Sequence, residues 1–390
     1  MRRDVLIVGG GVIGLALAWR LRQAGASVAV VERGLCGGGT SPASAGFLQA
    51  APDLIHAAPA MLELTLAARA SWPAFARELE AASGVPVGLE KRGIVAAALD
   101  ESDDAVLDAR ERRYREHGLP VERLSAAAAR RKEWSLTPAL RGALLLKGDL
   151  WVNPYSMGAA LTEAFRRAGG RTYERERVLG LERAGGRAVG VRTRSRRIAA
   201  DAVVLAAGAR SGPLAEPEVP RGSIVPARGQ IIVLGGRDAR GGAVLQRAVT
   251  SPSVWAVPQN DGRLWVGGAR EPLEQRESLD TSPRAETTEA LHHAVRRLLP
   301  AAADLAFDGA VVGHPCRVAD RLPVLGASRS TDGLYYALAV YRAGILVAPE
   351  IARLLTPLVL RGDQDRSLDR FGVERLAAPG TGQGGHDVIR

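Results

Sequence analysis

Three glycines near the start of the chain have the spacing of a dinucleotide-binding turn. They stand at Gly9, Gly11 and Gly14, directly after the apolar run 5–8. In such a turn the first glycine bends a strand sharply into a helix, the second lets a pyrophosphate approach the backbone, and the third allows close packing of helix on strand. The phosphates then lie at the positive N-terminal end of the helix.

An acidic residue follows at the distance that this interpretation requires. Glu32 comes 23 positions after Gly9 and directly follows a second apolar run, residues 28–31. A carboxylate at this place accepts both hydroxyls of an adenosine ribose and disfavours a 2′-phosphate. Because strand, helix, second strand and acid stand in one register, they favour a bound dinucleotide over the alternative, a Rossmann-like fold that binds none.

The elements that must position these residues indicate an α/β protein with two interleaved domains. A chain of 390 residues, 46% of them apolar, exceeds what one hydrophobic core supports. Residues 201–208 are apolar almost throughout, as in a parallel strand covered on both faces, whereas residues 223–268 alternate short strands with turns, as in an antiparallel sheet. We expect a Rossmann-like nucleotide-binding domain made of residues 1–85, 145–220 and 312–375, an α+β substrate domain built on an antiparallel sheet made of residues 86–144 and 221–311, and a flexible tail at 376–390.

Hydrophobic spacing, prolines and turn residues predict the other elements. The expected helices span residues 58–82, 101–117, 125–132, 154–167, 284–298 and 345–361. The expected strands include residues 92–99, 142–146, 307–313 and 334–339, with short strands between 171 and 190 that turn at Gly185-Gly186.

The charge pattern argues against a nucleic-acid-binding protein. The net charge is +10, but lysine occurs only at positions 91, 132 and 147, and the arginines are spread over the whole chain rather than gathered in one stripe. One dense run, Arg192 to Arg197, is expected to form an exposed hairpin, with an anionic binding patch as the alternative.

Other classes of protein are also disfavoured. The longest apolar runs are far shorter than the ~20 residues of a membrane span, and the N-terminus enters a strand directly, so we expect no signal peptide and a cytoplasmic location. The two cysteines, Cys36 and Cys316, form neither a disulfide framework nor a metal cluster. We expect no metal site.

Several further segments extend the pattern to nearly the whole chain. They are Gly39-Thr-Ser-Pro-Ala-Ser-Ala-Gly46-Phe-Leu48, Asp201 to Ser211, Pro226-Ala-Arg-Gly-Gln230, Trp255-Ala-Val-Pro258, Asp261 to Gly268 and Tyr341-Arg-Ala-Gly-Ile-Leu-Val-Ala-Pro349. Together with the glycine turn, they resemble the D-amino-acid oxidase and glycine oxidase family of FAD-dependent oxidoreductases, over about residues 3–361.

The resemblance implies a set of contacts with FAD. The first turn would hold the adenosine half, the loop after Glu32 would run under the pyrophosphate and flavin, and the segment after Arg342 would turn around the pyrimidine end of the flavin. The residues implied are Gly9, Gly11, Gly14, Glu32, Arg33, Thr40, Ser41, Ala45, Gly46, Val178, Ala207, Gly208, Gly344, Ile345 and Leu346. Some relatives bond FAD through a cysteine in the region of Cys316, but the spacing differs here, so we expect noncovalent FAD.

The resemblance also implies residues that contact the substrate. Arg342 is similar to the family arginine that grips the substrate carboxylate; the alternative is a surface arginine that caps a helix. Trp255 falls where relatives tend to have a tyrosine beside the substrate, which suggests a less polar or flatter substrate unless Trp255 belongs to the core.

One departure from the family pattern concerns the substrate carboxylate. A second family arginine is replaced by Pro315 in Gly313-His-Pro-Cys-Arg317. Two alternatives are open for Arg317: a local shift returns it to the pocket, or it points into solvent. His314 either offers a polar contact or is structural. Plain glycine held in the usual manner is therefore disfavoured as substrate.

The function expected from this resemblance is oxidation of a carbon–nitrogen bond in an amino acid or secondary amine. A hydride would pass to flavin N5, the imine would hydrolyse, and O2 would reoxidise the flavin to give H2O2. Two alternatives remain open: oxidation of a 2-hydroxy acid on the same fold, and an RNA-modifying flavoprotein. A noncatalytic dinucleotide-binding protein is a further alternative.

Overall fold

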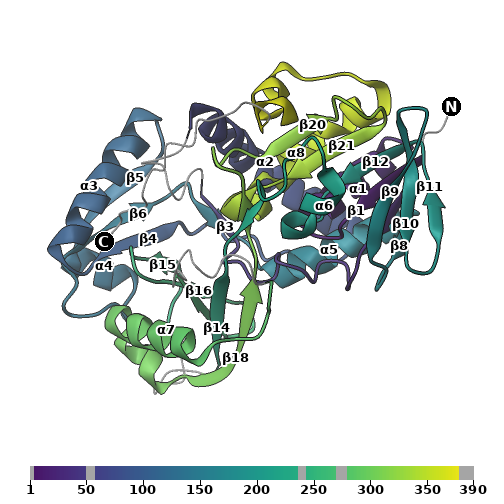
Figure 1. The fold of residues 1–390 in the computed structure, drawn as a ribbon. Coiled ribbons are helices and arrows are strands. Elements are labelled where there is room, and N and C mark those ends of the chain that lie inside the picture. Colours follow the sequence, from purple (N-terminus) through teal and green to yellow (C-terminus); the bar gives the residue numbers. More distant parts are fainter. Residues whose placement is uncertain (1–3, 50–57, 236–242, 269–278, 377–390) are drawn as a thin grey trace.

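A six-stranded sheet forms the centre of one half of the molecule (Figure 1). The computed structural model describes residues 4–49, 58–235, 243–268 and 279–376. The strand order is β20-β21-β12-β1-β2-β8, and neighbours are parallel except for β20, which runs antiparallel to β21. The strands are β1 (Asp4–Val8), β2 (Ser27–Val31), β8 (Arg171–Tyr173), β12 (Ala202–Leu205), β20 (Val324–Ala327) and β21 (Leu334–Leu338).

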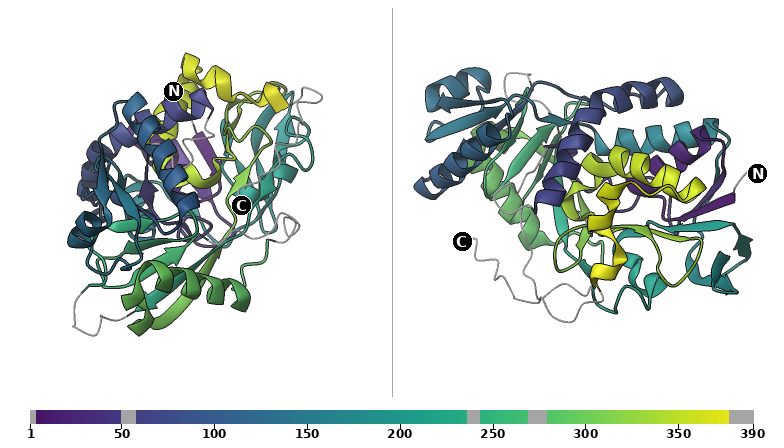
Figure 2. Two further views of the ribbon diagram at one scale, coloured as in Figure 1. Left: turned by 90° about the vertical axis from the view of Figure 1, so that its left-hand side faces the viewer. Right: turned by 90° about the horizontal axis from the view of Figure 1, so that it is seen from above.

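Helices cover one face of this sheet and a small second sheet covers the other. Side chains alternate along β1, so that Val5 and Ile7 join the helices in one core while Leu6 and Val8 join the small sheet in another. Figure 2 shows the layer of helices in its right-hand view. The helices are α1 (Val12–Gln23), α2 (Pro59–Ser83), α5 (Pro154–Arg167) and α8 (Gly344–Arg361).

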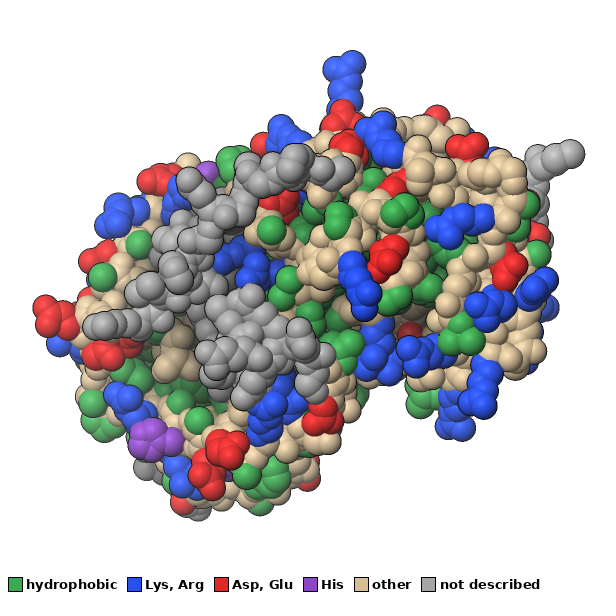
Figure 3. Space-filling view, in the orientation of Figure 1, with side chains coloured by type: hydrophobic (Ala, Val, Ile, Leu, Met, Phe, Trp, Pro, Cys, Tyr) green, Lys and Arg blue, Asp and Glu red, His purple; other side chains and the backbone are tan. Residues whose placement is uncertain are grey.

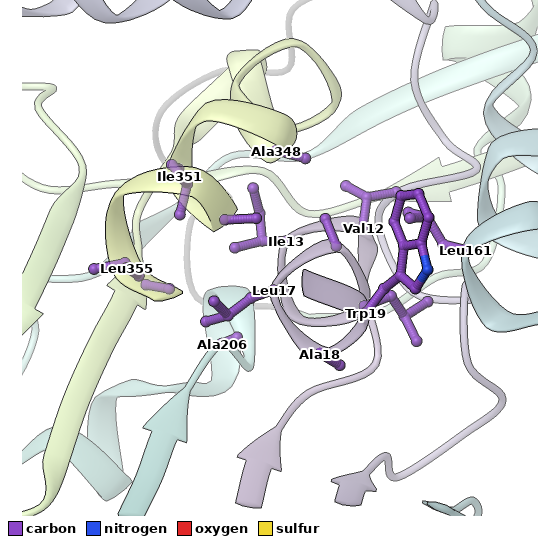
Figure 4. Close-up of a cluster of buried hydrophobic side chains, with 14 of the residues drawn as sticks. Val12, Ile13, Leu17, Ala18, Trp19, Leu161, Ala206, Ala348, Ile351 and Leu355 are labelled. Carbon is purple, nitrogen blue, oxygen red and sulfur yellow. The ribbon is translucent and has the colours of Figure 1, made fainter. Parts of the chain in front are cut away.

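The core between these helices explains why α1 and α8 are apolar on most sides. Leu17 and Trp19 of α1 meet Ile351 and Leu355 of α8 and Leu161 of α5 in one buried cluster (Figure 4). The segment Tyr341–Arg361 is long and apolar enough to cross a membrane by length and composition, but 67% of its most apolar window is buried inside the protein. Because α8 packs against α1 and α2, its composition is that of a core helix.

The small sheet on the other face is an antiparallel meander. It consists of β9 (Val178–Ala184), β10 (Arg187–Thr193) and β11 (Arg197–Ala199), with Gly185 and Gly186 in the first turn, as predicted. The arginine-rich run lies in the hairpin between β10 and β11, where Arg192 lies 3.7 Å from Glu182 and Arg196 lies 3.8 Å from Glu176. On the face shown in Figure 3, basic side chains are interspersed with acidic ones over both halves of the molecule.

An eight-stranded sheet forms the other half, in the order β18-β14-β17-β16-β15-β4-β6-β5. Helix α7 packs on one face, and the opposite face meets α3 and residues of the first half. The elements are β4 (Ile94–Ala98), α3 (Glu101–Glu116), β5 (Val121–Ser125), α4 (Ala126–Lys132), β6 (Gly142–Leu146), β14 (Gly229–Gly235), β15 (Ala248–Thr250), β16 (Trp255–Pro258), β17 (Leu264–Gly267), α7 (Ala285–Leu298) and β18 (Ala306–Gly313).

The sheet is largely antiparallel, as predicted, and contains one parallel pair. Strands β4 and β15 are parallel. They come from separate stretches of the chain, so no hairpin connects them and no turn fixes their relative direction. All other pairs in the sheet are antiparallel.

The remaining elements are short, and most of them were not predicted. They are β3 (Phe47–Leu48) paired with β7 (Leu150–Trp151), β13 (Val225–Pro226) paired with β19 (Cys316–Arg317), the helix α6 (Gly212–Ala215), and the 3-10 turns η1 (Gly208–Arg210), η3 (Pro300–Asp304), η4 (Tyr341–Ala343), η5 (Arg366–Phe371) and η6 (Val373–Leu376). The predicted long helices and strands agree with the structure to within a few residues. The predicted tail lies outside the described residues after Leu376.

Candidate active site

The glycine turn has the geometry that its spacing predicts. Gly9 adopts φ +111°, and a Cβ on it would lie 2.4 Å from the carbonyl oxygen of Ala206 at the end of β12. A Cβ on Gly14 would lie 2.0 Å from the carbonyl oxygen of Gly9. No other residue type fits these two positions, because both contacts are with backbone. The turn therefore brings α1 against the carboxyl ends of β1 and β12.

Gly11 has a different role from its two neighbours, because it faces open space. It is the N-cap of α1 in an extended conformation, and a Cβ on it would meet only the hydroxyl of Ser41, at 3.5 Å. Ser41 accepts a hydrogen bond from the amide of Val12 at 3.2 Å, and no acidic side chain occupies the first turn of α1. This cradle at a helix N-terminus fits the pyrophosphate of a dinucleotide.

Glu32 is held beside the same glycine turn. One carboxylate oxygen accepts a hydrogen bond from the amide of Gly10 and the other accepts from the amide of Gly34, each at 2.8 Å. Each oxygen keeps a second lone pair for a ribose hydroxyl. The fixed carboxylate therefore fits the adenosine ribose.

Three arginines lie close enough to one another near Glu32 for their charges to interact. Arg210 follows Gly208 in η1, and its pKa is lowered, first by burial and then by the charges of Arg33 and Arg177. Arg33 directly follows Glu32, and Arg177 directly precedes Val178, so the resemblance-based positions Val178, Ala207 and Gly208 lie in one neighbourhood. A group of like charges at a nucleotide crevice favours an anionic ligand.

The loop after Glu32 runs from the glycine turn to the half that contains the eight-stranded sheet. The hydroxyl of Thr40 accepts a hydrogen bond from the amide of His314 at 3.1 Å. A Cβ on Gly313 would lie 2.7 Å from the Cβ of Ala43, so β18 ends directly on the loop. Gly46, at φ +74°, would place a Cβ 2.0 Å from the carbonyl oxygen of Val152. The loop is thus clamped between both halves.

Two aromatic rings form a wall beyond this loop. The ring of Phe47 meets the indole of Trp255 edge to face, with centroids 5.8 Å apart. Trp255 is half-buried and lies flat over Gly267, where a Cβ would be 2.2 Å from the indole. Ala45 and Val257 complete the apolar surroundings. Trp255 is therefore placed at the junction of the halves rather than deep in a core.

The turn that carries Arg342 is unusual in its backbone. Ala339 and Tyr341 both adopt positive φ, at 58° and 49°, a conformation that non-glycine residues hold only where the surroundings impose it. The side chain of Arg342 is exposed, and Ile345 and Leu346 at the start of α8 are buried. The carbonyl oxygen of Leu346 accepts a hydrogen bond from the indole of Trp72 at 2.8 Å, which fixes the start of α8.

Arg317 lies beside this turn. Its strand β19 packs against η4, and the thiol of Cys316 hydrogen-bonds the backbone of Ala339. Burial raises the pKa of Cys316 to about 11, so the thiol stays protonated. Arg317 is half-buried and has no ion pair among the described residues. The structure thus brings together the two elements that carry Arg317 and Arg342.

His314 lies on a separate cluster. Burial first, then the charges of Arg228 and Arg210, lower its pKa, so the imidazole is neutral at neutral pH. It bonds to the backbone of Asp280, and its Nε2 has no hydrogen-bond partner among the described residues. Arg228 is buried and donates to the carbonyl oxygens of Asp280, at 2.6 Å, and Ser282.

Three site residues were not assigned a role from the sequence. Phe47 lies near the end of the segment 39–48 that carries the family resemblance. Arg228 lies inside a segment that carries the family resemblance, and Arg210 follows Gly208. Their contacts join residues far apart in the chain, such as Phe47 with Trp255 and Arg210 with the carbonyl oxygen of Leu279, and no local spacing predicts these pairs.

Among residues 4–49, 58–235, 243–268 and 279–376, no group of three or more His, Cys, Asp or Glu side chains is placed to hold a metal ion.

Comparison with known proteins decides the family. The family model described as "DAO: FAD dependent oxidoreductase" matches residues 4–358. The chain belongs to this family. It is an FAD-dependent oxidoreductase of the amino-acid oxidase type, and the glycine turn, Glu32 and the open side of Gly11 are the features that fit FAD.

Individual relatives support the same conclusion. The chain is 31% identical to a glycine oxidase of Geobacillus kaustophilus, over 96% of this chain and 97% of the relative, and 30% identical to a glycine oxidase of Pseudomonas aeruginosa, over 92% and 95%. The crystal structure of the Geobacillus enzyme superposes with a TM-score of 0.88, covering 96% of this chain and 99% of that one. An iminodiacetate oxidase of Chelativorans sp. BNC1, 24% identical, shares the fold with a TM-score of 0.82 over 94% and 98% of the two chains.

Proposed function

We propose that this protein oxidises the carbon–nitrogen bond of an amino acid or secondary amine that carries a carboxylate and an apolar, flat substituent. The observation that carries the proposal is the position of Arg342, exposed on a backbone-constrained turn directly before the buried start of α8. The glycine oxidases among its relatives support an amino acid as substrate.

The chain's own residues bind and orient the substrate. Arg342 offers a planar fork of donors, which suits a carboxylate better than a lysine would. Arg317 lies beside the same turn and supplies a second positive charge in place of the family arginine lost at Pro315. Two cations at one end of the site favour an anionic group on the substrate and fix its direction.

The aromatic wall selects the rest of the substrate. Trp255 and Phe47 present apolar ring surface where a tyrosine hydroxyl would offer a hydrogen bond. An N-substituted or aromatic amine gains contact with these rings, whereas plain glycine leaves them exposed to water. The wall also keeps water from the reacting carbon. When bound, FAD supplies the acceptor for the hydride that leaves this carbon, and water hydrolyses the resulting imine.

Two finer features belong to the same proposal. FAD is held without a covalent bond, because the protonated, buried Cys316 is a poor nucleophile. O2 accepts the electrons and yields H2O2.

Anaerobic mixing tests the proposal. The FAD-loaded protein is mixed with amino acids, N-substituted glycines, amines without a carboxylate and 2-hydroxy acids, and the visible absorbance of oxidised flavin is followed. Carboxylate-bearing amines are expected to bleach the flavin, and air is expected to restore it with release of H2O2. Bleaching by 2-hydroxy acids alone would overturn the proposal.

A further inference from the structure

A fully buried carboxylate lies behind the aromatic wall and has no part in the chemistry described so far. Asp149 has 0% exposure. It directly precedes β7, while Gln49 directly follows β3, and these two strands pair in the register Leu48 with Leu150. Asp149 and Gln49 are therefore the next cross-strand pair of the ladder that carries Phe47.

The carboxylate joins this ladder to two helices. One oxygen of Asp149 accepts hydrogen bonds from the hydroxyl of Tyr114 in α3, at 2.5 Å, and from the side-chain amide of Gln49, at 3.2 Å. The other oxygen has no hydrogen bond and lies 3.6 Å from the guanidinium of Arg69 in α2. The charge of Arg110 in α3 also acts on Asp149. Within the described parts of the chain, these are the charged and titratable groups that act on the carboxylate.

The ionised and neutral forms of Asp149 hold Gln49 differently. An ionised carboxylate accepts from Tyr114 and Gln49 together, and burial raises the pKa of Tyr114 well above its usual value, so its hydroxyl stays a donor. Protonation of the free oxygen removes the negative charge from the carboxyl group, so the hydrogen bonds that the shared oxygen accepts from Tyr114 and Gln49 are no longer charge-assisted and weaken. Gln49, which is 3% exposed, has no water to replace that bond.

Phe47 links the contact between Gln49 and Asp149 to the aromatic wall. Phe47 pairs with Trp151 in the same two-residue ladder, and its ring supports the indole of Trp255. A ladder this short has few backbone hydrogen bonds, so its register depends on the Gln49–Asp149 pair at one end and on the bond from the amide of Val152 to the carbonyl oxygen of Gly46, 3.0 Å, at the other.

We propose that Asp149 is a positioning residue for the aromatic wall: through Gln49 it holds Phe47 against Trp255, and its ionisation makes ligand affinity depend on pH. The proposal rests on the proposed function only in taking Trp255 and Phe47 as the wall of the ligand pocket. Burial, opposed by Tyr114, Arg69, Gln49 and Arg110, raises the pKa of Asp149 to about 6, which places the change in the weakly acidic range.

The sign of the effect follows from these contacts. Above this pKa Asp149 is ionised, Gln49 is held and the wall is formed. As the pH falls through about 6, Asp149 becomes neutral and affinity for a flat ligand falls. The weakening of this hydrogen bond from charge-assisted to neutral predicts a rise in Kd of roughly three- to tenfold.

Binding of benzoate to the FAD-loaded protein tests the proposal without turnover. Benzoate has a carboxylate and a flat ring but no C–N bond to oxidise, and its Kd is measured from the change in flavin absorbance between about pH 5 and 8. The wild-type protein is expected to bind more weakly at acidic pH, with an inflection near the pKa of Asp149. Asp149→Asn is expected to abolish the inflection, and Tyr114→Phe to move it upward by about one pH unit, because the ionised form loses a donor.

Glu133→Gln provides a matched control. Glu133 is also a buried carboxylate with a raised pKa, caused chiefly by burial, but it is bound to Arg247, 3.0 Å away, at the far end of α4. This variant is expected to keep the wild-type inflection. The proposal is overturned if Asp149→Asn retains the inflection, if Tyr114→Phe leaves it in place, or if benzoate does not perturb the flavin at any pH. If benzoate binding titrates as expected while no amine bleaches the flavin, the proposed function fails and the role of Asp149 stands.

Discussion

Arg342 is the residue on which substrate recognition depends most in this account. Its replacement by alanine is expected to lower kcat/KM for carboxylate-bearing amines by roughly 10- to 100-fold, because a charge-assisted bidentate contact is lost. The matched amine without a carboxylate is expected to change little. Steady-state kinetics with such a pair of substrates checks the prediction. For the carboxylate-bearing amine, kcat/KM of Arg342→Lys should lie between the values for the wild type and Arg342→Ala. An equal loss for both substrates would instead indicate a role in folding or in holding FAD.

Cys316 gives a second prediction at the scale of single residues. Because the thiol is buried and its pKa is raised to about 11, FAD is expected to remain noncovalent. Acid precipitation of the FAD-loaded protein should leave the flavin in the supernatant, for the wild type and for Cys316→Ser alike. Flavin that stays with the wild-type pellet but not with the Cys316→Ser pellet would refute the prediction.

Among the structural elements, the packing of α1 on β1 depends on Gly14. Alanine is favoured over glycine within a helix by about 1 kcal/mol. At Gly14, however, the added Cβ would lie 2.0 Å from a backbone oxygen that cannot move away without breaking the turn. The clash is expected to outweigh the helical preference, and Gly14→Ala should lower the free energy of unfolding by about 3 kcal/mol.

Urea unfolding of the FAD-free protein measures this change. Gly142→Ala in β6 is the control, because its Cβ would make an ordinary contact of 3.5 Å. It is expected to alter stability by less than about 1 kcal/mol. Similar unfolding curves for the two variants would show that α1 can shift at no cost.

An element could be predicted where the residues that determine it are close together in the sequence. The turn at Gly9 to Gly14, the helix that begins after Asn153 and the apolar strand β12 each carry their signal within a short stretch, and the structure agrees with them. The parallel pairing of β4 with β15 depends on strands far apart in the chain, and it was not predicted.

The site shows the same division. The residues expected at the cofactor lie along contiguous motifs, and all of them belong to the part of the chain that the structure describes. The network of Asp149, Tyr114 and Gln49 joins residues 35 and 100 positions apart, and β3 and β7 are only two residues long. Such contacts arise from tertiary packing, and no periodicity in the sequence marks them.

The molecule as a whole places the loop 39–47 where its two halves meet. One end of the loop lies beside Gly11 through the bond from the amide of Val12 to Ser41, and the other end carries Phe47 against Trp255 of the eight-stranded sheet. Gly313 and His314 contact the middle of the loop at Thr40 and Ala43. FAD bound at the glycine turn and a substrate at the aromatic wall are thus joined by a single stretch of chain.

The central claim is that FAD binds along this path, and Gly11 allows the most direct test. Its extended backbone suits any residue and its Cβ direction is open, so only the weaker N-cap preference of alanine acts, and Gly11→Ala should lower the stability of the FAD-free protein by no more than about 1 kcal/mol. The same Cβ would occupy the space expected for the pyrophosphate.

Titration of the FAD-free protein with FAD, followed by flavin fluorescence, is the deciding measurement. The wild-type protein is expected to bind one FAD per chain, and Gly11→Ala is expected to raise the Kd at least about tenfold without loss of folding. A folded wild-type protein that binds no FAD, or a Gly11→Ala variant that binds it as tightly as the wild type, would contradict the account.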